Sequence, residues 1–160
     1  NFVGFLYAGL MIINDEPFLI EYNVRMGDPE CQTILPKLES DFGEIIEACV
    51  NEKLHLINLD WSNDKSLCIV LCSKGYPEKY YNNIEIKNLK NLPLNKDEFI
   101  FHAGTQEKNS KIYSNGGRVL NFVIKSEEFK KSRDRAIHLI DKINWENGFF
   151  RKDIGYKVIK

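Results

Sequence analysis

A tight turn between two apolar runs is the feature that most constrains the fold of this 160-residue chain. Residues 2–13 are rich in β-branched, aromatic and leucine side chains, and Asn14-Asp15-Glu16-Pro17 separates them from the apolar start of residues 18–23. Asn, Asp and Pro favour turns because they suit the dihedral angles that a chain reversal needs. We therefore expect an antiparallel hairpin, with a first strand over 2–13 that is buried on both faces in its middle and a second strand over 18–23.

The second strand would deliver polar groups at its end. Residues two apart on a strand point to the same face, so Glu21 and Asn23 project together with Cα atoms roughly 6.5–7 Å apart. A carboxylate and an amide oxygen suit a hard cation such as Mg²⁺ (or Mn²⁺), which keeps waters and also binds substrate phosphates. Arg25 continues the alternation and offers a planar fork of donors to a phosphate. The pattern predicts a cation site for phosphoryl transfer, although an exposed strand can carry Glu and Asn for solubility alone.

Two amphipathic helices are expected. The first, over 41–53, begins with Asp41 and Glu44, which fit the Asp form of a capping box. The second, over about 127–143, begins after Ser126, which we expect to cap it. Apolar residues recur along both segments at helical spacing, so both are predicted to pack against a core.

Short strands account for much of the rest. The polar segment 58–65 predicts a division into domains over 1–61 and 62–160. Beyond it, the fully apolar run 66–72 is typical of a central strand. Further short strands are expected at 84–87, 99–103, 112–113 and 118–124, and within 149–159. The predicted fold is α+β: an antiparallel sheet plus helix, followed by a small, mainly antiparallel β domain with one helix.

Composition excludes several classes of protein. A formal net charge of −1 provides no basic field for nucleic acid, and no apolar run reaches the roughly 20 residues that cross a membrane. The four cysteines form no Cys-x-x-Cys pair and the three histidines are scattered, which argues against a zinc site. We expect free thiols and a reducing cytoplasm. The start at Asn1 has no initiator Met and no basic segment, so we expect no signal peptide and a start partway through a longer chain.

One long motif is specific enough to indicate a family. Glu-x-Asn-x-Arg-x-Gly-Asp-Pro-Glu-x-Gln spans residues 21–32 and follows Leu6-Tyr7-Ala8-Gly9-Leu10-Met11. Further blocks occur in order at residues 73–77, 101–105, 115–119 and 151–155. Together they closely resemble the C-terminal part of the phosphoribosylamine–glycine ligase family (glycinamide ribonucleotide synthetases), which are ATP-grasp enzymes of purine biosynthesis. The resemblance covers essentially the whole chain.

The resemblance implies a reaction and the residues that serve it. ATP would phosphorylate the carboxylate of glycine, and the amine of 5-phosphoribosylamine would attack this glycyl phosphate to give glycinamide ribonucleotide, ADP and phosphate. Glu21 and Asn23 would hold Mg²⁺ on the ATP phosphates. Arg25 would be catalytic by stabilising the transferring phosphoryl group or the acyl phosphate.

The turn after the strand is a candidate substrate site. A Gly-Asp-Pro turn beside a metal can hold a substrate amine on its carboxylates, so Asp28, Pro29 and Glu30 would face glycine or the ribosylamine, with Asp28 also assigned to catalysis. The alternative is that Asp28 only caps the following segment.

A second phosphate site is a possibility at residues 115–118. The backbone N–H groups of Gly116 and Gly117 and the guanidinium of Arg118 suit a phosphate, and in the family the C-terminal domain lies against the catalytic cleft. A plain hairpin turn between two apolar runs explains the Asn-Gly-Gly sequence equally well. His102 can be a general base or, as we favour, a hydrogen-bonded structural residue.

A large part of such an enzyme is missing from these residues. No Gly-rich phosphate-covering loop, adenine pocket or ribose-phosphate domain is recognisable, so the required partner would be the N-terminal remainder of the same enzyme, in the same or a companion chain. We expect no turnover by this chain alone. Two alternatives stay open: an ATP-grasp ligase with a different amine substrate, and a non-enzymatic docking module over about 62–160.

Overall fold

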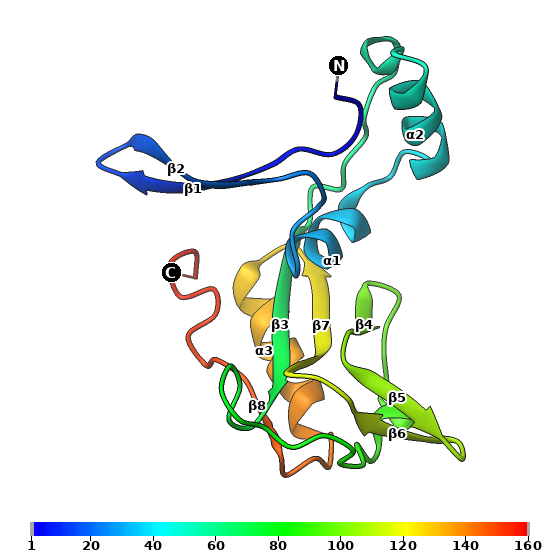
Figure 1. Cartoon of the computed structure of the whole chain (residues 1–160), viewed down its shortest axis with the longest axis vertical. Coiled ribbons are helices and arrows are strands. Elements are labelled where there is room, and N and C mark those ends of the chain that lie inside the picture. The colour runs from blue at the N-terminus through cyan, green and yellow to red at the C-terminus, as the bar shows by residue number, and fades with distance from the viewer. Residues whose placement is uncertain (1, 160) are drawn as a thin grey trace. The chain divides into compact units, whose positions relative to one another are not determined.

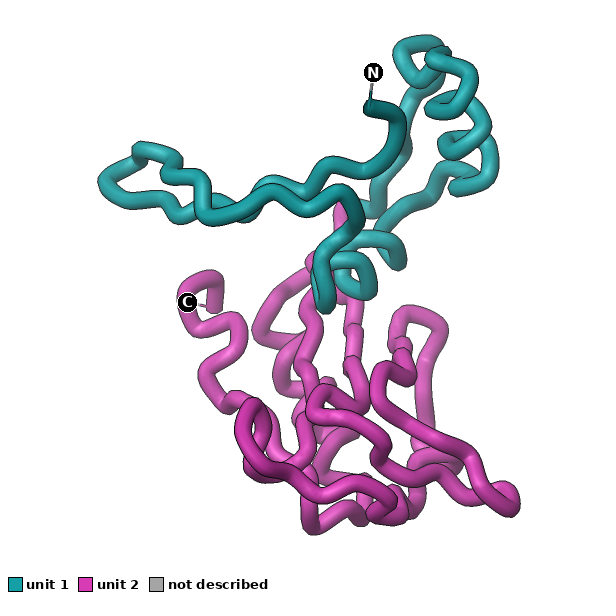
Figure 2. Tube along the Cα trace, in the orientation of Figure 1, with its two compact units in different colours: residues 1–62 teal, residues 63–160 magenta. Residues whose placement is uncertain are grey.

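The computed structural model describes residues 2–159 and divides the chain into two compact units, residues 1–62 and 63–160 (Figure 2). The division into domains over 1–61 and 62–160 stays a prediction. Unit 1 contains a two-stranded sheet and short helices, and unit 2 contains two antiparallel sheets and one longer helix (Figure 1). The mixture of helices and antiparallel sheets confirms the predicted α+β class.

The hairpin of unit 1 pairs β1 (Tyr7–Ile13) with β2 (Glu16–Asn23) in antiparallel register. Asn14 and Asp15 form the turn with positive φ values of 52° and 65°, as a two-residue hairpin turn requires. The predicted hairpin is therefore confirmed, although β1 begins at Tyr7 and β2 already includes Glu16. The predicted burial of the first strand is wrong: its apolar side chains are about half exposed, namely Leu10, Met11, Ile12 and Ile13 at 50–59%.

The helices of unit 1 follow local signals. The Asp41 carboxylate accepts a hydrogen bond from the Glu44 N–H at 3.0 Å, so the predicted cap is confirmed, and α2 spans Phe42–Val50. It ends short of the predicted residue 53, and Glu52 beyond it adopts a positive φ of 58°. Sequence reasoning missed the short helix α1 (Glu30–Ile34), which the 3₁₀ turn η1 (Leu35–Lys37) continues. A second 3₁₀ turn, η2, covers Leu54–Leu56.

A four-stranded antiparallel sheet forms the core of unit 2, in the order β4-β7-β3-β8 (Figure 1). Its strands are β3 (Lys65–Ser73), β4 (Glu98–His102), β7 (Arg118–Ser126) and β8 (Gly148–Phe149). The helix α3 (Phe129–Asp141) packs against β3 and β7. The apolar run 66–72 is an inner strand, as predicted, and along β7 the side chains of both faces are buried. This sheet and helix contribute most of the side chains of a buried hydrophobic cluster.

Several predicted details of unit 2 are wrong. The Asn115-Gly116-Gly117 segment is no hairpin turn, because β6 (Lys111–Ser114) pairs with the unpredicted β5 (Thr105–Lys108), whereas β7 belongs to the larger sheet. Residues 84–87 form isolated bridges at Glu85 and Lys87 and no regular strand. They lead to the 3₁₀ turn η3 (Leu89–Asn91). In the tail, residues 150–159 form turns, and the predicted final strand is absent from this described stretch.

Ser126 does not cap α3. Its hydroxyl donates to the carbonyl of Glu128 and contacts the hydroxyl of Ser132, both at 2.8 Å, and the helix starts after Glu128 without a side-chain cap. Among residues 2–159 no helix is both long and apolar enough to cross a membrane. The four cysteines are free thiols of intermediate exposure.

A buried ion pair joins the start of β4 to α3. The Glu98 carboxylate, whose side chain is 6% exposed, accepts hydrogen bonds from Arg135 Nε at 2.7 Å and Nη2 at 2.9 Å. The backbone and side-chain N–H groups of Asn95 donate to the same carboxylate. A bidentate pair with further donors meets the conditions under which a buried charge is tolerated.

We expect Glu98→Gln to lower the free energy of unfolding by about 2 kcal/mol at pH 7 and to flatten its pH dependence. Burial raises the pKa of the Glu98 carboxyl, but the hydrogen bonds from Arg135 and Asn95 lower it more, so the pKa lies below its ordinary value. A lowered folded-state pKa stabilises the protein above the unfolded pKa, and this stabilisation is lost as the pH falls through the folded pKa.

Urea unfolding from pH 7 down to pH 2 measures both effects. Glu127→Gln is the matched control, because the Glu127 side chain is 85% exposed and its ion pair with Lys131 is screened by solvent. An identical pH slope for Glu98→Gln and the parent chain would contradict the prediction.

Candidate functional site

The base of the hairpin carries a polar face. Strand pairing places Tyr7 opposite Asn23 and Gly9 opposite Glu21. Residues directly opposite on paired strands share a face. Asn23 Nδ2 donates a hydrogen bond to Glu21 Oε1 at 2.9 Å, so the structure brings these two predicted residues together. Gly9 leaves space beside them, because a Cβ at this position would lie 3.3 Å from Glu21 Cγ.

Glu21 and Asn23 form a donor set that suits Mg²⁺. The hydrogen bond between them uses the amide nitrogen, so the Asn23 oxygen and the second Glu21 oxygen stay available. Across residues 2–159 no cluster of three His, Cys, Asp or Glu side chains is arranged to hold a metal. A pair of oxygen ligands is nevertheless sufficient for a cation whose other ligands are water and substrate phosphates.

Arg25 lies beyond the end of β2. The strand ends at Asn23, and residues 24–25 form a bend, so the prediction that Arg25 continues the strand alternation is wrong. Its guanidinium Nη1 donates to the carbonyl oxygen of the neighbouring Met26 at 2.9 Å, and the residue is exposed. An Arg on an exposed bend is free to turn toward a ligand, since only one local hydrogen bond has to break.

The loop after β2 holds two carboxylates. Asp28 Oδ1 accepts a hydrogen bond from Gln32 Nε2 at 2.9 Å. The carbonyl of Pro29 accepts one from Thr33 Oγ1 at 2.8 Å. The helix α1 starts at Glu30 without a side-chain cap, so the alternative in which Asp28 caps the following helix is not what the structure has.

Tyr7 is the residue that sequence reasoning missed. Its hydroxyl donates to Glu30 Oε1 at 3.3 Å, which ties β1 to the first residue of α1. The negative charge of Glu30 and then burial raise the pKa of the Tyr7 phenol, with a smaller contribution from Glu21, so the phenol keeps its proton. No sequence signal pointed to it, because only a register shift between Gly9 and Leu10 places residue 7 opposite Asn23.

The candidate phosphate residues of unit 2 lie in a tightly packed connection between two sheets. The buried Ser73 uses its hydroxyl to donate to the Gly116 carbonyl at 2.7 Å and its N–H to donate to the Gly117 carbonyl at 2.8 Å. A Cβ on Gly117 would overlap the ring of Tyr76. Packing alone therefore accounts for these glycines. Arg118 lies near Cys72, where burial raises the pKa of the thiol and the guanidinium partly offsets that shift.

His102 is exposed at the end of β4. Its Nδ1 lies 2.8 Å from Thr105 Oγ1. This contact within one turn of the chain fits the structural alternative that the sequence favoured.

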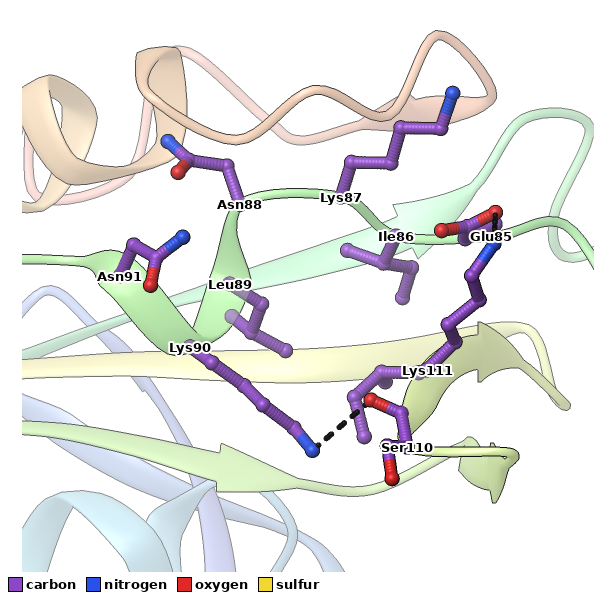
Figure 3. Close-up of a pocket in the computed structure, with 10 residues that line it drawn as sticks. Glu85, Ile86, Lys87, Asn88, Leu89, Lys90, Asn91, Ser110 and Lys111 are labelled. Atoms are coloured by element: carbon purple, nitrogen blue, oxygen red, sulfur yellow. Dashed lines mark hydrogen bonds and ion pairs between the residues drawn. The ribbon is translucent and has the colours of Figure 1, made fainter.

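Unit 2 also contains a cavity of about 170 Å³. Three lysines line it, but two of them are paired: Figure 3 shows the Lys90 ammonium turned toward Ser110 and the Lys111 ammonium turned toward Glu85. Lys90 also forms an ion pair with Glu107 at 2.8 Å. These internal pairs leave little charge for a ligand, so the hairpin base is the better candidate site.

Comparison with known proteins assigns both parts of the chain to one family. Residues 66–157 match the family described as phosphoribosylglycinamide synthetase, C domain, and residues 1–31 match phosphoribosylglycinamide synthetase, ATP-grasp (A) domain. The second match contains Tyr7, Glu21, Asn23, Arg25 and Glu30.

Comparison with individual relatives supports the same family assignment. The chain is 43% identical to phosphoribosylamine–glycine ligase of Fusobacterium nucleatum over 97% of its own length and 37% of the relative. It is 41% identical to the trifunctional purine biosynthetic protein adenosine-3 of Gallus gallus over 99% of its own length and 16% of that protein. A crystal structure of phosphoribosylamine–glycine ligase from Thermotoga maritima superposes with a TM-score of 0.69 at 32% identity, covering 93% of this chain and 36% of that one. The chain thus spans 31–37% of the length of the phosphoribosylamine–glycine ligases it matches.

We expect Gly117→Ala to lower the free energy of unfolding by about 1–3 kcal/mol, because the new methyl group forces the Tyr76 ring to move. Urea denaturation measures the loss. In a Tyr76→Ala background the methyl group meets no ring, so the same substitution should have a much smaller effect there. An equal loss in both backgrounds would mean that the Gly117 backbone, and not the ring, sets the requirement for glycine.

Proposed function

This chain belongs to the phosphoribosylglycinamide synthetase family, and from that premise we propose that it is the C-terminal part of a phosphoribosylamine–glycine ligase. In the proposed reaction ATP phosphorylates the glycine carboxylate, and the amine of 5-phosphoribosylamine displaces the phosphate to form glycinamide ribonucleotide. ADP is released in the first step and phosphate in the second, and the release of both makes formation of the amide bond favourable. The proposed setting is purine biosynthesis in the cytoplasm.

The observation that carries the proposal is the Glu21–Asn23 pair at the end of β2. The two side chains lie 2.9 Å apart on one face, within the segment that matches the ATP-grasp domain. They would hold Mg²⁺ (or Mn²⁺), which would supply positive charge against the ATP phosphates. Arg25 would leave the Met26 carbonyl and stabilise the negative charge that develops on the transferred phosphoryl group.

The carboxylates of the following loop suit the ammonium group of glycine. Among residues 2–159, Glu21 and Glu30 have no ion pair with a protein cation, because Glu21 contacts the neutral amide of Asn23 and Glu30 contacts the neutral phenol of Tyr7. Their negative charge is therefore retained for a cationic ligand. Asp28, Pro29 and Glu30 would bind the glycine ammonium, because the amine of 5-phosphoribosylamine must stay uncharged to attack.

Unit 2 would contribute to substrate binding through residues 116–118. The carbonyl groups of Gly116 and Gly117 are occupied by Ser73, so the N–H groups are what this segment would offer to a phosphate, together with Arg118. We assign this contact to the phosphate of 5-phosphoribosylamine.

The exposed side chains of the hairpin support the proposal that a further protein segment completes the enzyme. Apolar side chains of β1 and β2 are at least half exposed, among them Leu10, Ile12, Phe18, Leu19 and Ile20. Exposed apolar side chains gathered on one hairpin are typical of a surface that another protein segment covers. We propose that the N-terminal remainder of the ligase, in the same or a companion chain, covers it and supplies the adenine and ribose-phosphate sites.

We expect the isolated 160-residue chain to release no ADP, and the polypeptide that also carries the N-terminal part found in its relatives to release ADP only with both substrates present. The assay couples ADP release to a dye, generates 5-phosphoribosylamine in situ, and omits glycine in the control. Glycine-dependent ADP release by the isolated chain would refute the requirement for the N-terminal part. Release with another amine or acid alone would identify a ligase of different specificity.

Glu21→Gln in the complete polypeptide should lower kcat by about a hundredfold or more, because it removes the charged ligand of the cation. Glu16→Gln is the matched control: it makes the same change on the same exposed strand, opposite Ile13 at the turn, and should leave kcat unchanged. Circular dichroism checks that both variants fold. Full activity of Glu21→Gln would favour a docking module over an enzyme that uses this site.

A further inference from the structure

We propose that Tyr7 is a positioning residue that fixes the Glu30 carboxylate for the ammonium group of glycine. The inference rests on the proposed function and extends it to a residue outside the Glu-x-Asn-x-Arg-x-Gly-Asp-Pro-Glu motif. Tyr7 acts through Glu30 and needs no contact with the substrate itself.

The hydrogen bond between the two residues joins separate elements. Tyr7 is the first residue of β1, and Glu30 is the first residue of α1, 23 positions later. The phenol donates to Oε1 at 3.3 Å in a partly buried setting. Tyr7 also lies opposite Asn23, so the residue that holds Glu30 is fixed by the same strand register as the proposed cation ligand.

The other oxygen of the same carboxylate lies against a glycine. Gly27 is buried, and a Cβ on it would lie 2.8 Å from Glu30 Cδ and overlap Oε2. The carbonyl of Gly27 accepts a hydrogen bond from the Cys31 N–H at 2.9 Å, which holds the loop against the start of α1. Tyr7 thus holds one oxygen of Glu30, and the absence of a side chain at residue 27 leaves room for the other oxygen.

A restrained carboxylate binds a cation better than a mobile one. A free Glu side chain loses rotamer entropy when a ligand immobilises it, and a side chain already held in place avoids that loss. An ionised carboxylate has about four acceptor sites, so one phenol donor leaves capacity for an ammonium group. Since Glu30 has no ion pair among the described residues, its charge is not neutralised by the protein.

The test is Tyr7→Phe in the complete ligase, which removes the hydroxyl and keeps the ring. We expect the KM for glycine to rise about tenfold, as for the loss of one hydrogen bond to a charged group. The kcat and the KM for ATP should stay within about twofold, because the chemistry and the nucleotide site are untouched. Tyr22→Phe is the matched control, since its side chain is 62% exposed in the same hairpin and lies opposite Ala8.

A double-mutant cycle with Glu30→Gln separates positioning from general destabilisation. If Tyr7 acts through Glu30, Tyr7→Phe adds no further rise in the glycine KM once Glu30 is Gln. An unchanged glycine KM in Tyr7→Phe, or an equal rise in both backgrounds, would overturn the inference. A parent enzyme without glycine-dependent ADP release would instead refute the proposed function, so the two failures are distinguishable.

Discussion

The register of the β1–β2 hairpin is the constraint on which the candidate site depends. From the turn up to Leu10 each pair follows the two-residue loop, with Ile13 opposite Glu16 and Leu10 opposite Leu19. The register then shifts by one residue, so that Gly9 pairs with Glu21 and Tyr7 with Asn23, and Ile20 is left unpaired. Because a shift of one residue changes which side chains face each other, this irregularity brings Asn23 rather than Tyr22 beside Tyr7.

The two units differ in how far their apolar side chains are buried and in whether their carboxylates form ion pairs. In unit 2 the sheet and α3 enclose their apolar side chains, and the buried Glu98 is paired with Arg135. In unit 1 the hairpin exposes its apolar side chains, and Glu21 and Glu30 contact only neutral donors. A hairpin is at best marginally stable by itself. The first arrangement is complete within the chain, whereas we propose that the second is completed by further protein on the apolar side chains and by cationic ligands at the carboxylates.

Sequence reasoning recovered the features that local physics decides. The Asn14-Asp15 turn, the Asp41 cap and the inner strand 66–72 depend on residues close in sequence, and all three are confirmed. Sequence reasoning failed where contacts between residues far apart in the sequence decide the structure. Asn115-Gly116-Gly117 has the composition of a hairpin turn, but β7 obtains more pairing from β3 and β4 than β6 could give. Ser126 was free to cap α3 but contacts Ser132 instead. Within the candidate site, spacing placed Glu21 beside Asn23, yet no pattern indicated Tyr7, because its partner Glu30 is reached only through the shifted register.

Two motif positions require glycine, each for a different physical reason. At Gly27 the absent side chain leaves space for the carboxylate of Glu30, the first residue of α1. At Gly117 it leaves space for the ring of Tyr76, and the carbonyl accepts from Ser73. Neither residue has a positive φ, so backbone freedom is not what selects glycine at either place. The first glycine leaves room for a charged group that can bind a cation, whereas the second completes a packed connection.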